Sequence, residues 1–143
     1  MLSALREGDE LVAPCPAWPE FKKTVFRFEA HVDWKAYAIV TACNPLGSKA
    51  SPKENVTQDS RLQEELESRG IRPVRVYGCS PDLKHQEPGW AAPLSREDAI
   101  VLGTEFRQDA IFYVTGKIVC LVSCPPNPRA CESLGELGER LVQ

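Results

Sequence analysis

The chain has 143 residues, a length typical of one domain, and its 43% apolar and 26% charged content is that of a folded globular protein. The net charge of −3 excludes the strongly basic surface with which proteins bind nucleic acid phosphates. The longest nearly apolar run, residues 36–43, is far shorter than the ~20 residues of a membrane-spanning helix, so we expect no membrane segment.

The first 20 residues are expected to be poorly ordered. Pro14, Pro16 and Pro19 interrupt regular structure there, and most of the first dozen residues are charged or small. The charges within residues 6–10 stand where a signal peptide would need an apolar stretch, which predicts a cytoplasmic protein.

Two strands are predicted next. In residues 24–30 the aromatic Phe26 and Phe28 alternate with charged residues, which is typical of a half-buried strand. Residues 37–42 are almost continuously apolar, as in a strand that is covered on both faces. The turn sequence Asn-Pro-Leu-Gly at residues 44–47 ends this second strand.

A helix is predicted to begin directly after Ser51. Ser51 can cap the helix, Pro52 suits its first position, and Glu54 completes a capping box. The helix should continue to about residue 69, because Gly70 is a typical helix stop.

The second half of the chain predicts one more helix between strands. Residues 73–77 alternate as a short strand, and residues 79–93 form a loop, with or without a short strand near residues 90–92. Ser95 begins a helix that reaches about residue 108.

A hairpin then follows, with strands at residues 110–114 and 118–123 around Gly116. Residues 125–143 are expected to be a proline-containing tail with a short helix through its leucines.

These elements predict an α+β fold for a single domain at residues 21–124. A helix that connects two strands of one sheet predicts a parallel crossover, and the hairpin predicts an antiparallel pair. We therefore expect a two-layer sandwich, in which a mixed sheet of five or six strands carries the two main helices on one face.

Two motifs resemble the signature of a bacterial family. The run Thr41-Ala42-Cys43-Asn44-Pro45 ends an apolar strand, and Glu54-Asn55 opens a helix. Together they resemble the family called domain of unknown function 3293, whose members are also similar in three later segments, here Gly78, Glu87-Pro88 and Gln108-Asp109-Ala110. The resemblance spans roughly residues 21–122 and implies a bacterial origin. The chain departs from the pattern at Gly89-Trp90, where a serine and an apolar residue are expected.

Five polar residues are predicted to form a ligand site. In a sheet with crossover helices, ligands bind beyond the carboxyl ends of strands, where helix N-termini offer unpaired N–H groups. The residues expected to meet there and bind a small polar or anionic ligand are Thr41, Asn44, Glu54, Asn55 and Glu87. Each also has an ordinary structural role open to it, as a turn, a cap or a loop tie.

Two other functions stay open at this point. The strand at residues 118–123 could pair with a second copy at a sheet edge and make a homodimer, or Trp18, Trp34 and Trp90 could form a protein-binding surface. Alternatively, Glu54 and Glu87 could act as the acid and base of a small hydrolase or transferase.

The six cysteines are expected to be free thiols that behave as small apolar residues. We expect no metal site, because there is no Cys-x-x-Cys pair and Cys120 and Cys124 would lie ~13 Å apart along an extended strand. A disulfide between Cys124 and Cys131 across the proline-rich turn is geometrically feasible. No motif indicates a cofactor.

Overall fold

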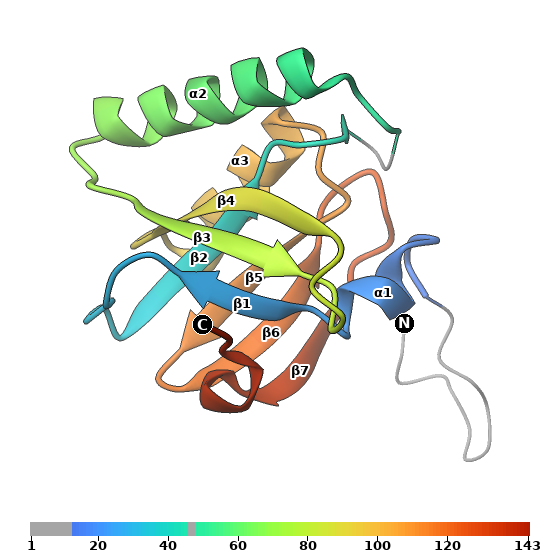
Figure 1. The fold of residues 1–143 in the computed structure, drawn as a ribbon, viewed down its shortest axis with the longest axis vertical. Coiled ribbons are helices and arrows are strands. Elements are labelled where there is room, and N and C mark those ends of the chain that lie inside the picture. The colour runs from blue at the N-terminus through green and yellow to red at the C-terminus, as the bar shows by residue number, and fades with distance from the viewer. Residues whose placement is uncertain (1–12, 46–47) are drawn as a thin grey trace.

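The structure is a computed structural model and describes residues 13–45 and 48–143 (Figure 1). The expectations for residues 1–12, and for the last two residues of the predicted turn at residues 44–47, lie outside the described part. In chain order the elements are α1 (Trp18–Phe21), β1 (Val25–Phe28), β2 (Ala36–Thr41), α2 (Pro52–Ser68), β3 (Val74–Cys79), β4 (Gln86–Ala92), α3 (Arg96–Glu105), β5 (Ala110–Thr115), β6 (Ile118–Ser123), β7 (Cys131–Glu136) and the 3-10 helix η3 (Leu137–Arg140).

Seven strands form one sheet in the order β1-β3-β4-β2-β5-β6-β7, and every neighbouring pair is antiparallel. The sheet curls into a half-barrel (Figure 1). The predicted two-layer sandwich with a mixed sheet of five or six strands is therefore wrong.

The error comes from assuming that a helix connects neighbouring strands. Helix α2 connects β2 to β3, which run in the same direction but have β4 between them. Helix α3 connects β4 to β5, which likewise run in the same direction with β2 between them. Each crossover is thus an interleaved β-α-β unit, and the inserted strand leaves only antiparallel neighbours.

Strand β4 lies near the centre of the sheet although its sequence contains Pro88 and Gly89, which are uncommon in such strands. Gly89 is required here, since a Cβ atom at this position would lie 2.8 Å from both Thr41 Cγ2 and the Val40 carbonyl oxygen of β2.

The predicted edge strand at residues 118–123 is not an edge. It is β6, which pairs with β5 on one side and with β7 on the other. The edge strand β7 carries Glu132, Glu136 and a glycine at positive φ, Gly135 (φ 87°), and charges and irregularity of this kind discourage pairing with another chain.

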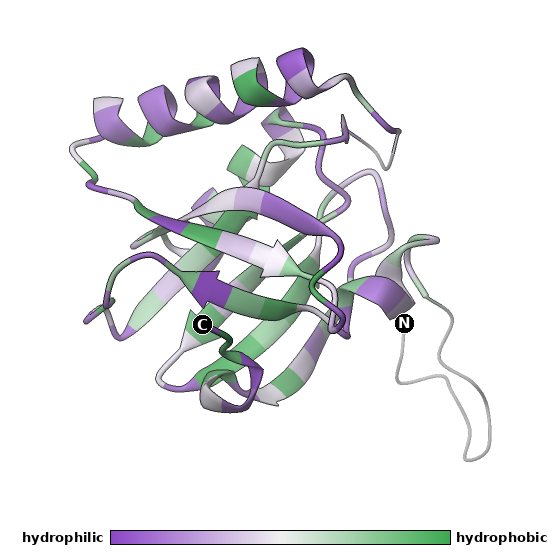
Figure 2. Ribbon diagram, viewed as in Figure 1, coloured by the Kyte–Doolittle hydropathy of each residue, from purple (hydrophilic) through white to green (hydrophobic). Residues whose placement is uncertain are grey.

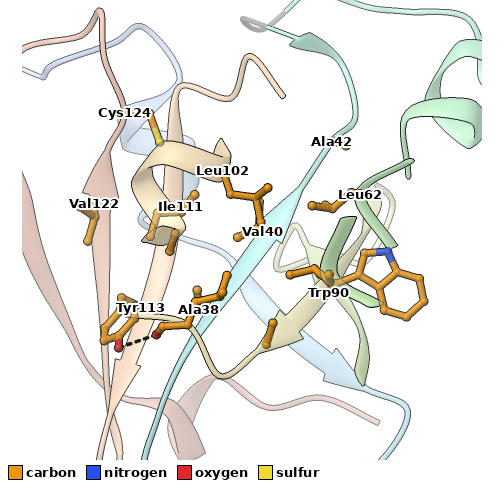
Figure 3. Packing of buried hydrophobic residues seen from close by; sticks show 14 residues of the cluster. Ala38, Val40, Ala42, Leu62, Trp90, Leu102, Ile111, Tyr113, Val122 and Cys124 are labelled. Atoms are coloured by element: carbon orange, nitrogen blue, oxygen red, sulfur yellow. Dashed lines mark hydrogen bonds between the residues drawn. The ribbon is translucent and has the colours of Figure 1, made fainter. Parts of the chain in front are cut away.

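One apolar core lies between the sheet and the helices. Leu62 and Leu66 of α2 and Leu102 of α3 are fully buried in it. Figure 3 shows Leu102 beside Val40 of β2, and it marks the 2.8 Å hydrogen bond that the Tyr113 hydroxyl donates to the Leu94 carbonyl. Most other positions of α2 face solvent, and the helix is correspondingly hydrophilic in Figure 2.

A second apolar core lines the other face of the curled sheet. Phe26 of β1 is fully buried and packs edge-on against Phe112 of β5, with ring centroids 4.9 Å apart. The C-terminal segment closes this core along β1. Leu141 forms a parallel bridge with Phe26, and the Arg140 guanidinium donates hydrogen bonds to the carbonyls of Lys22 (2.8 Å) and Thr24 (3.0 Å).

Residues 13–21 pack on the sheet as a short hook. Cys15 and Trp18 are buried against Leu121 of β6. The Trp18 indole N–H donates to Glu132 Oε1 of β7 at 3.1 Å, and the same carboxylate pairs with Lys22 Nζ at 2.7 Å.

The three tryptophans do not form the exposed surface considered from the sequence. Trp18 and Trp90 are 2% and 7% exposed, and Trp34 packs on Tyr37 with a ring separation of 5.9 Å. No helix of the described residues is both long enough and apolar enough to cross a bilayer.

Candidate functional site

The start of α2 forms as its sequence predicts. The Glu54 N–H donates to Ser51 Oγ at 3.1 Å, and the Ser51 N–H donates to Glu54 Oε1 at 3.3 Å, which completes the capping box. Glu54 is therefore engaged at the helix end. This fixed first turn positions Asn55 toward the end of β2.

Asn44 and Asn55 bind each other through two hydrogen bonds. The Asn44 N–H donates to Asn55 Oδ1 at 2.9 Å, and Asn55 Nδ2 donates to Asn44 Oδ1 at 3.0 Å. Asn44 Oδ1 also accepts the Ala50 N–H at 3.0 Å. Asn44 has a left-handed backbone (φ 48°), a conformation that asparagine tolerates better than most residues. These bonds tie the residues after β2 to the first turn of α2.

Glu87 of β4 lies on the other side of Asn44. Asn44 Nδ2 donates to Glu87 Oε2 at 3.4 Å, a long and weak hydrogen bond. Desolvation raises the pKa of Glu87, and the hydrogen bond from Asn44 opposes that rise only in part. Neighbouring protein atoms shield part of the Glu87 carboxylate from water, although the residue as a whole is exposed.

Thr41 is directed to a different partner, Gln108. Its hydroxyl donates to Gln108 Oε1 at 2.8 Å, while Gln108 Nε2 donates to the carbonyls of Cys43 (3.2 Å) and Phe106 (3.0 Å). Gln108 is 7% exposed, so this network lies inside the protein. It joins the end of β2 to the segment between α3 and β5.

Gln108 is positioned by the turn that ends α3. Arg107 has a left-handed backbone (φ 56°), and the Gln108 N–H donates back to the Gly103 carbonyl at 2.8 Å. Helix α2 ends in the same geometry, with Gly70 at φ 80° and the Ile71 N–H on the Leu66 carbonyl at 3.2 Å. In α3 an arginine thus occupies the position at which α2 has glycine.

An ion pair between α2 and β3 forms the base of this region. Arg75 donates to both carboxylate oxygens of Asp59 at 2.8 Å, and its guanidinium stacks 3.8 Å from the ring centroid of Trp90. The sequence analysis did not identify this pair. The available signal was that Asp59 lies three and seven residues before Leu62 and Leu66, which places a carboxylate on the apolar side of α2.

The polar residues border two separate pockets. One, of about 490 Å³, lies between α2 and strands β3 and β4; we call it the Glu87 pocket, and its lining includes Asn44, Asn55, Val56, Asp59, Arg75 and Glu87. The other, of about 590 Å³, lies between α2 and the end of α3, and its lining includes Lys53, Glu54, Asn55, Arg61, Glu105 and Arg107.

The structure therefore brings three of the five predicted residues together. Asn44, Asn55 and Glu87 meet at the Glu87 pocket, whereas Thr41 lines neither pocket. Glu54 and Glu87 line different pockets, so they do not face each other across one cavity as a hydrolytic carboxylate pair would.

The thiol beside the site is not activated. Desolvation, with smaller contributions from Glu87 and Asp59, raises the pKa of Cys43 to about 12, which keeps the thiol protonated near neutral pH. Among the described residues, no three or more histidine, cysteine, aspartate or glutamate side chains are grouped so that they could hold a metal ion.

The comparison with protein families gives a match. The family model described as "Protein of unknown function (DUF3293)" matches residues 40–111. No match was found among curated proteins or among solved structures. The matched segment is half of the chain and contains the residues that border the Glu87 pocket. The chain therefore belongs to the DUF3293 family.

Proposed function

We propose that this domain binds a small polar molecule in the Glu87 pocket, and that the bound molecule presents a cationic or hydrogen-bond-donating group to Glu87. The observation that carries the proposal is the charge balance of the lining. Its charged residues are Asp59, Arg75 and Glu87, and Arg75 is engaged with Asp59 through two 2.8 Å hydrogen bonds. Within the described residues Glu87 has no cationic partner.

Of the two ligand classes expected from the sequence, the negative charge of Glu87 supports a polar donor over an anion. An anion would meet an uncompensated carboxylate, whereas an ammonium, guanidinium, hydroxyl or amide group can donate to it. The desolvation that raises the pKa of Glu87 adds to this preference, because a donor placed on the carboxylate replaces part of the hydration that it has lost.

Asn44 and Asn55 contribute a fixed wall. Asn44 and Asn55 already bond to each other and to the Ala50 N–H, which supports a rim held in place beside Glu87. Thr41 supports the same strand end from inside through Gln108. A wall fixed in advance lowers the entropy cost of binding.

The size and the apolar rim fit a small organic molecule. A volume of about 490 Å³ is within the range of small-molecule sites. Val56 lines this pocket with 67% of its surface exposed, and Pro88 lies close to Glu87. A ligand with a short aliphatic part would cover Val56 while its donor reaches the carboxylate.

The setting proposed for this function is the bacterial cytoplasm. All six cysteines are free in the structure, which suits a compartment in which thiols stay reduced.

The experiment is a thermal-shift screen with two matched sets of small molecules, amines and amides in one and carboxylates and phosphates in the other. At 100 times its dissociation constant a ligand adds about 2.7 kcal/mol of stability, which shifts the unfolding midpoint by several degrees. We expect hits in the amine and amide set and their loss in Glu87→Gln. The control variant Glu105→Gln changes a carboxylate of the other pocket and should retain them.

Hits confined to the anionic set, no hit in either set, or equal binding by Glu87→Gln and the unchanged protein would each overturn the proposal. The pH dependence gives a separate check. Because the pKa of Glu87 is raised, binding should begin to weaken at a pH above the usual range of a glutamate as the solution is acidified.

A further inference from the structure

Two cysteines lie next to each other at the β6–β7 edge of the sheet. Cys131 pairs across the strands with Val122, and Cys120 pairs with Ser133, so the two cysteines are diagonal neighbours. Since Cys120 and Val122 are two residues apart, both cysteine side chains lie on the same face of the sheet. Desolvation raises the pKa of Cys120, and the charge of Cys131 and a hydrogen bond with its side chain raise it further.

A cation lies beside this pair. Arg96, the first residue of α3, has its Nη1 atom 3.8 Å from Cys131 Sγ, and its guanidinium lies 5.4 Å from the centroid of the Tyr113 ring. The thiolate is the nucleophilic form of cysteine. Arg96 is thus placed where a Cys131 thiolate would carry its negative charge.

The other cysteines do not share these properties. Cys15, Cys43, Cys79 and Cys124 are all buried, whereas Cys131 is exposed and Cys120 is half-buried. Cys124, which the sequence offered as a disulfide partner for Cys131, is 0% exposed, and desolvation raises its pKa to about 12. The accessible partner of Cys131 is Cys120.

We propose that Cys120 and Cys131 form a thiol–disulfide exchange site that reacts with low-molecular-weight disulfides such as oxidised glutathione. The Cys131 thiolate attacks one sulfur of the oxidised glutathione, forms a mixed disulfide and releases one glutathione thiolate. Cys120 then loses its proton and attacks Cys131 Sγ, which forms the Cys120–Cys131 disulfide and releases the second glutathione. The protein gives up two electrons and two protons, and one oxidised glutathione becomes two reduced molecules.

The position of the pair explains why such a bond would be reversible. Diagonal neighbours in an antiparallel sheet have Cα atoms ~7–8 Å apart, slightly beyond the usual reach of a disulfide. The register of β6 and β7 is irregular between Ile118 and Cys120, and β7 is held by a neighbouring strand on one side alone. A small shift of β7 can therefore close the distance, and the strain that remains makes the bond easier to reduce. This proposal is independent of the Glu87 pocket.

The experiment treats the reduced full-length protein with oxidised glutathione and follows the intact mass. We expect the loss of two hydrogen masses. Trypsin separates residues 118–129, which contain Cys120 and Cys124, from residues 130–140, which contain Cys131. Fragmentation of the linked peptides should place the bond on Cys120.

Five variants test the order of the steps and the part played by Arg96. Cys120→Ser should stop at a mixed disulfide on Cys131 and gain one glutathione mass. Cys131→Ser should gain neither a bond nor a stable adduct, and the control Cys79→Ser should react as the unchanged protein does. Arg96→Ala should slow alkylation of Cys131 roughly twofold to fivefold, the range of a surface charge pair, and Arg96→Lys should restore most of the rate.

A disulfide mapped to Cys124, an unchanged mass after prolonged oxidation, or loss of two hydrogen masses in Cys120→Ser would each overturn the proposal.

Discussion

Arg75 and Asp59 join β3 to α2 through a two-fold hydrogen-bonded ion pair with both distances at 2.8 Å, and the side chains are only 20% and 12% exposed. The pair lies under the Glu87 pocket and is packed against Trp90, whose indole N–H donates to the Asp59 carbonyl at 3.4 Å. It therefore ties the middle of α2 to the sheet through two short, charge-assisted hydrogen bonds.

Removing one partner of this pair should destabilise the domain. Arg75→Ala leaves the Asp59 carboxylate nearly buried without its cation, and we expect a loss of about 2–4 kcal/mol of unfolding free energy, measured by urea titration. The control is Arg69→Ala, which removes an exposed pair with Glu65 of the same helix and should cost less than ~0.5 kcal/mol. Equal losses of unfolding free energy in the two variants would show that the buried pair stabilises the domain no more than the exposed pair does.

Strand β4 can lie close to β2 because residue 89 is a glycine and has no side chain. Gly89→Ala would place a Cβ atom 2.8 Å from Thr41 Cγ2 and from the Val40 carbonyl oxygen, so the two central strands must separate. We expect a loss of about 1–3 kcal/mol in urea unfolding. Gly78→Ala in the adjacent strand is the matched control, because its Cβ atom would meet Thr24 Cγ2 at 3.5 Å, an ordinary contact. A loss in Gly78→Ala as large as that in Gly89→Ala would refute the steric explanation.

The residues that end α2 and α3, Gly70 and Arg107, both have a left-handed backbone. Substitution by glycine at the end of α3 and substitution of glycine at the end of α2 should therefore change the stability in opposite directions. Arg107→Gly relieves a left-handed arginine (φ 56°), so it should raise the stability by about 1 kcal/mol. Gly70→Ala places a side chain at φ 80° and should lower the stability by about 1 kcal/mol, although no atom lies within 4 Å of its Cβ position. Thermal unfolding of both variants tests this, and a change of the same sign in both would contradict the backbone explanation.

The contact between the N-terminal hook and β7 should weaken in acid. The hydrogen bond from Lys22, followed by that from Trp18, lowers the pKa of Glu132. Because the folded-state pKa lies below the unfolded value, the stabilisation is complete above the usual pKa of a glutamate and is lost as the pH falls through the lowered value. Glu132→Gln should therefore be less stable than the unchanged protein near neutral pH, by less than ~1 kcal/mol, and the difference should vanish in acid.

Urea unfolding at a series of pH values measures this dependence, with Glu64→Gln, an exposed glutamate of α2, as the control. A difference between Glu132→Gln and the unchanged protein that persists at low pH would contradict the assignment.

Local signals in the sequence predicted the elements whose cause is local. The capping box of Ser51 and Glu54, the apolar strand that became β2, and the hairpin of β5 and β6 all depend on residues close together in the chain, and all three are present. The predicted mixed sheet with parallel neighbours was wrong, because the pairing of strands depends on which distant segments meet. Strand β4 was predicted only in part, because Pro88 and Gly89 are unfavourable in strands. The strand is stabilised by pairing with its two neighbours, β2 and β3, rather than by its own propensity.

The C-terminal residues 125–143 are a second case in which long-range pairing overrides the local pattern. Leu134, Leu137 and Leu141 have helical spacing, yet residues 131–136 form β7 because β6 offers them a free side of the sheet. At the site, the clustering of Asn44, Asn55 and Glu87 followed from their places at the ends of elements. The partners of Thr41 and Asp59 could not be predicted, because Gln108 and Arg75 reach them from other strands and turns.

The interleaved order of the strands also has a kinetic consequence. β2 lies between β4 and β5 although it precedes both in the chain by several dozen residues, while β3–β4 and β5–β6 are each joined by short connections. The short hairpins can form quickly, but the sheet becomes continuous only when an early segment inserts between two late ones. Contact order of this kind slows folding, so refolding after dilution from denaturant should be limited by the docking of β2.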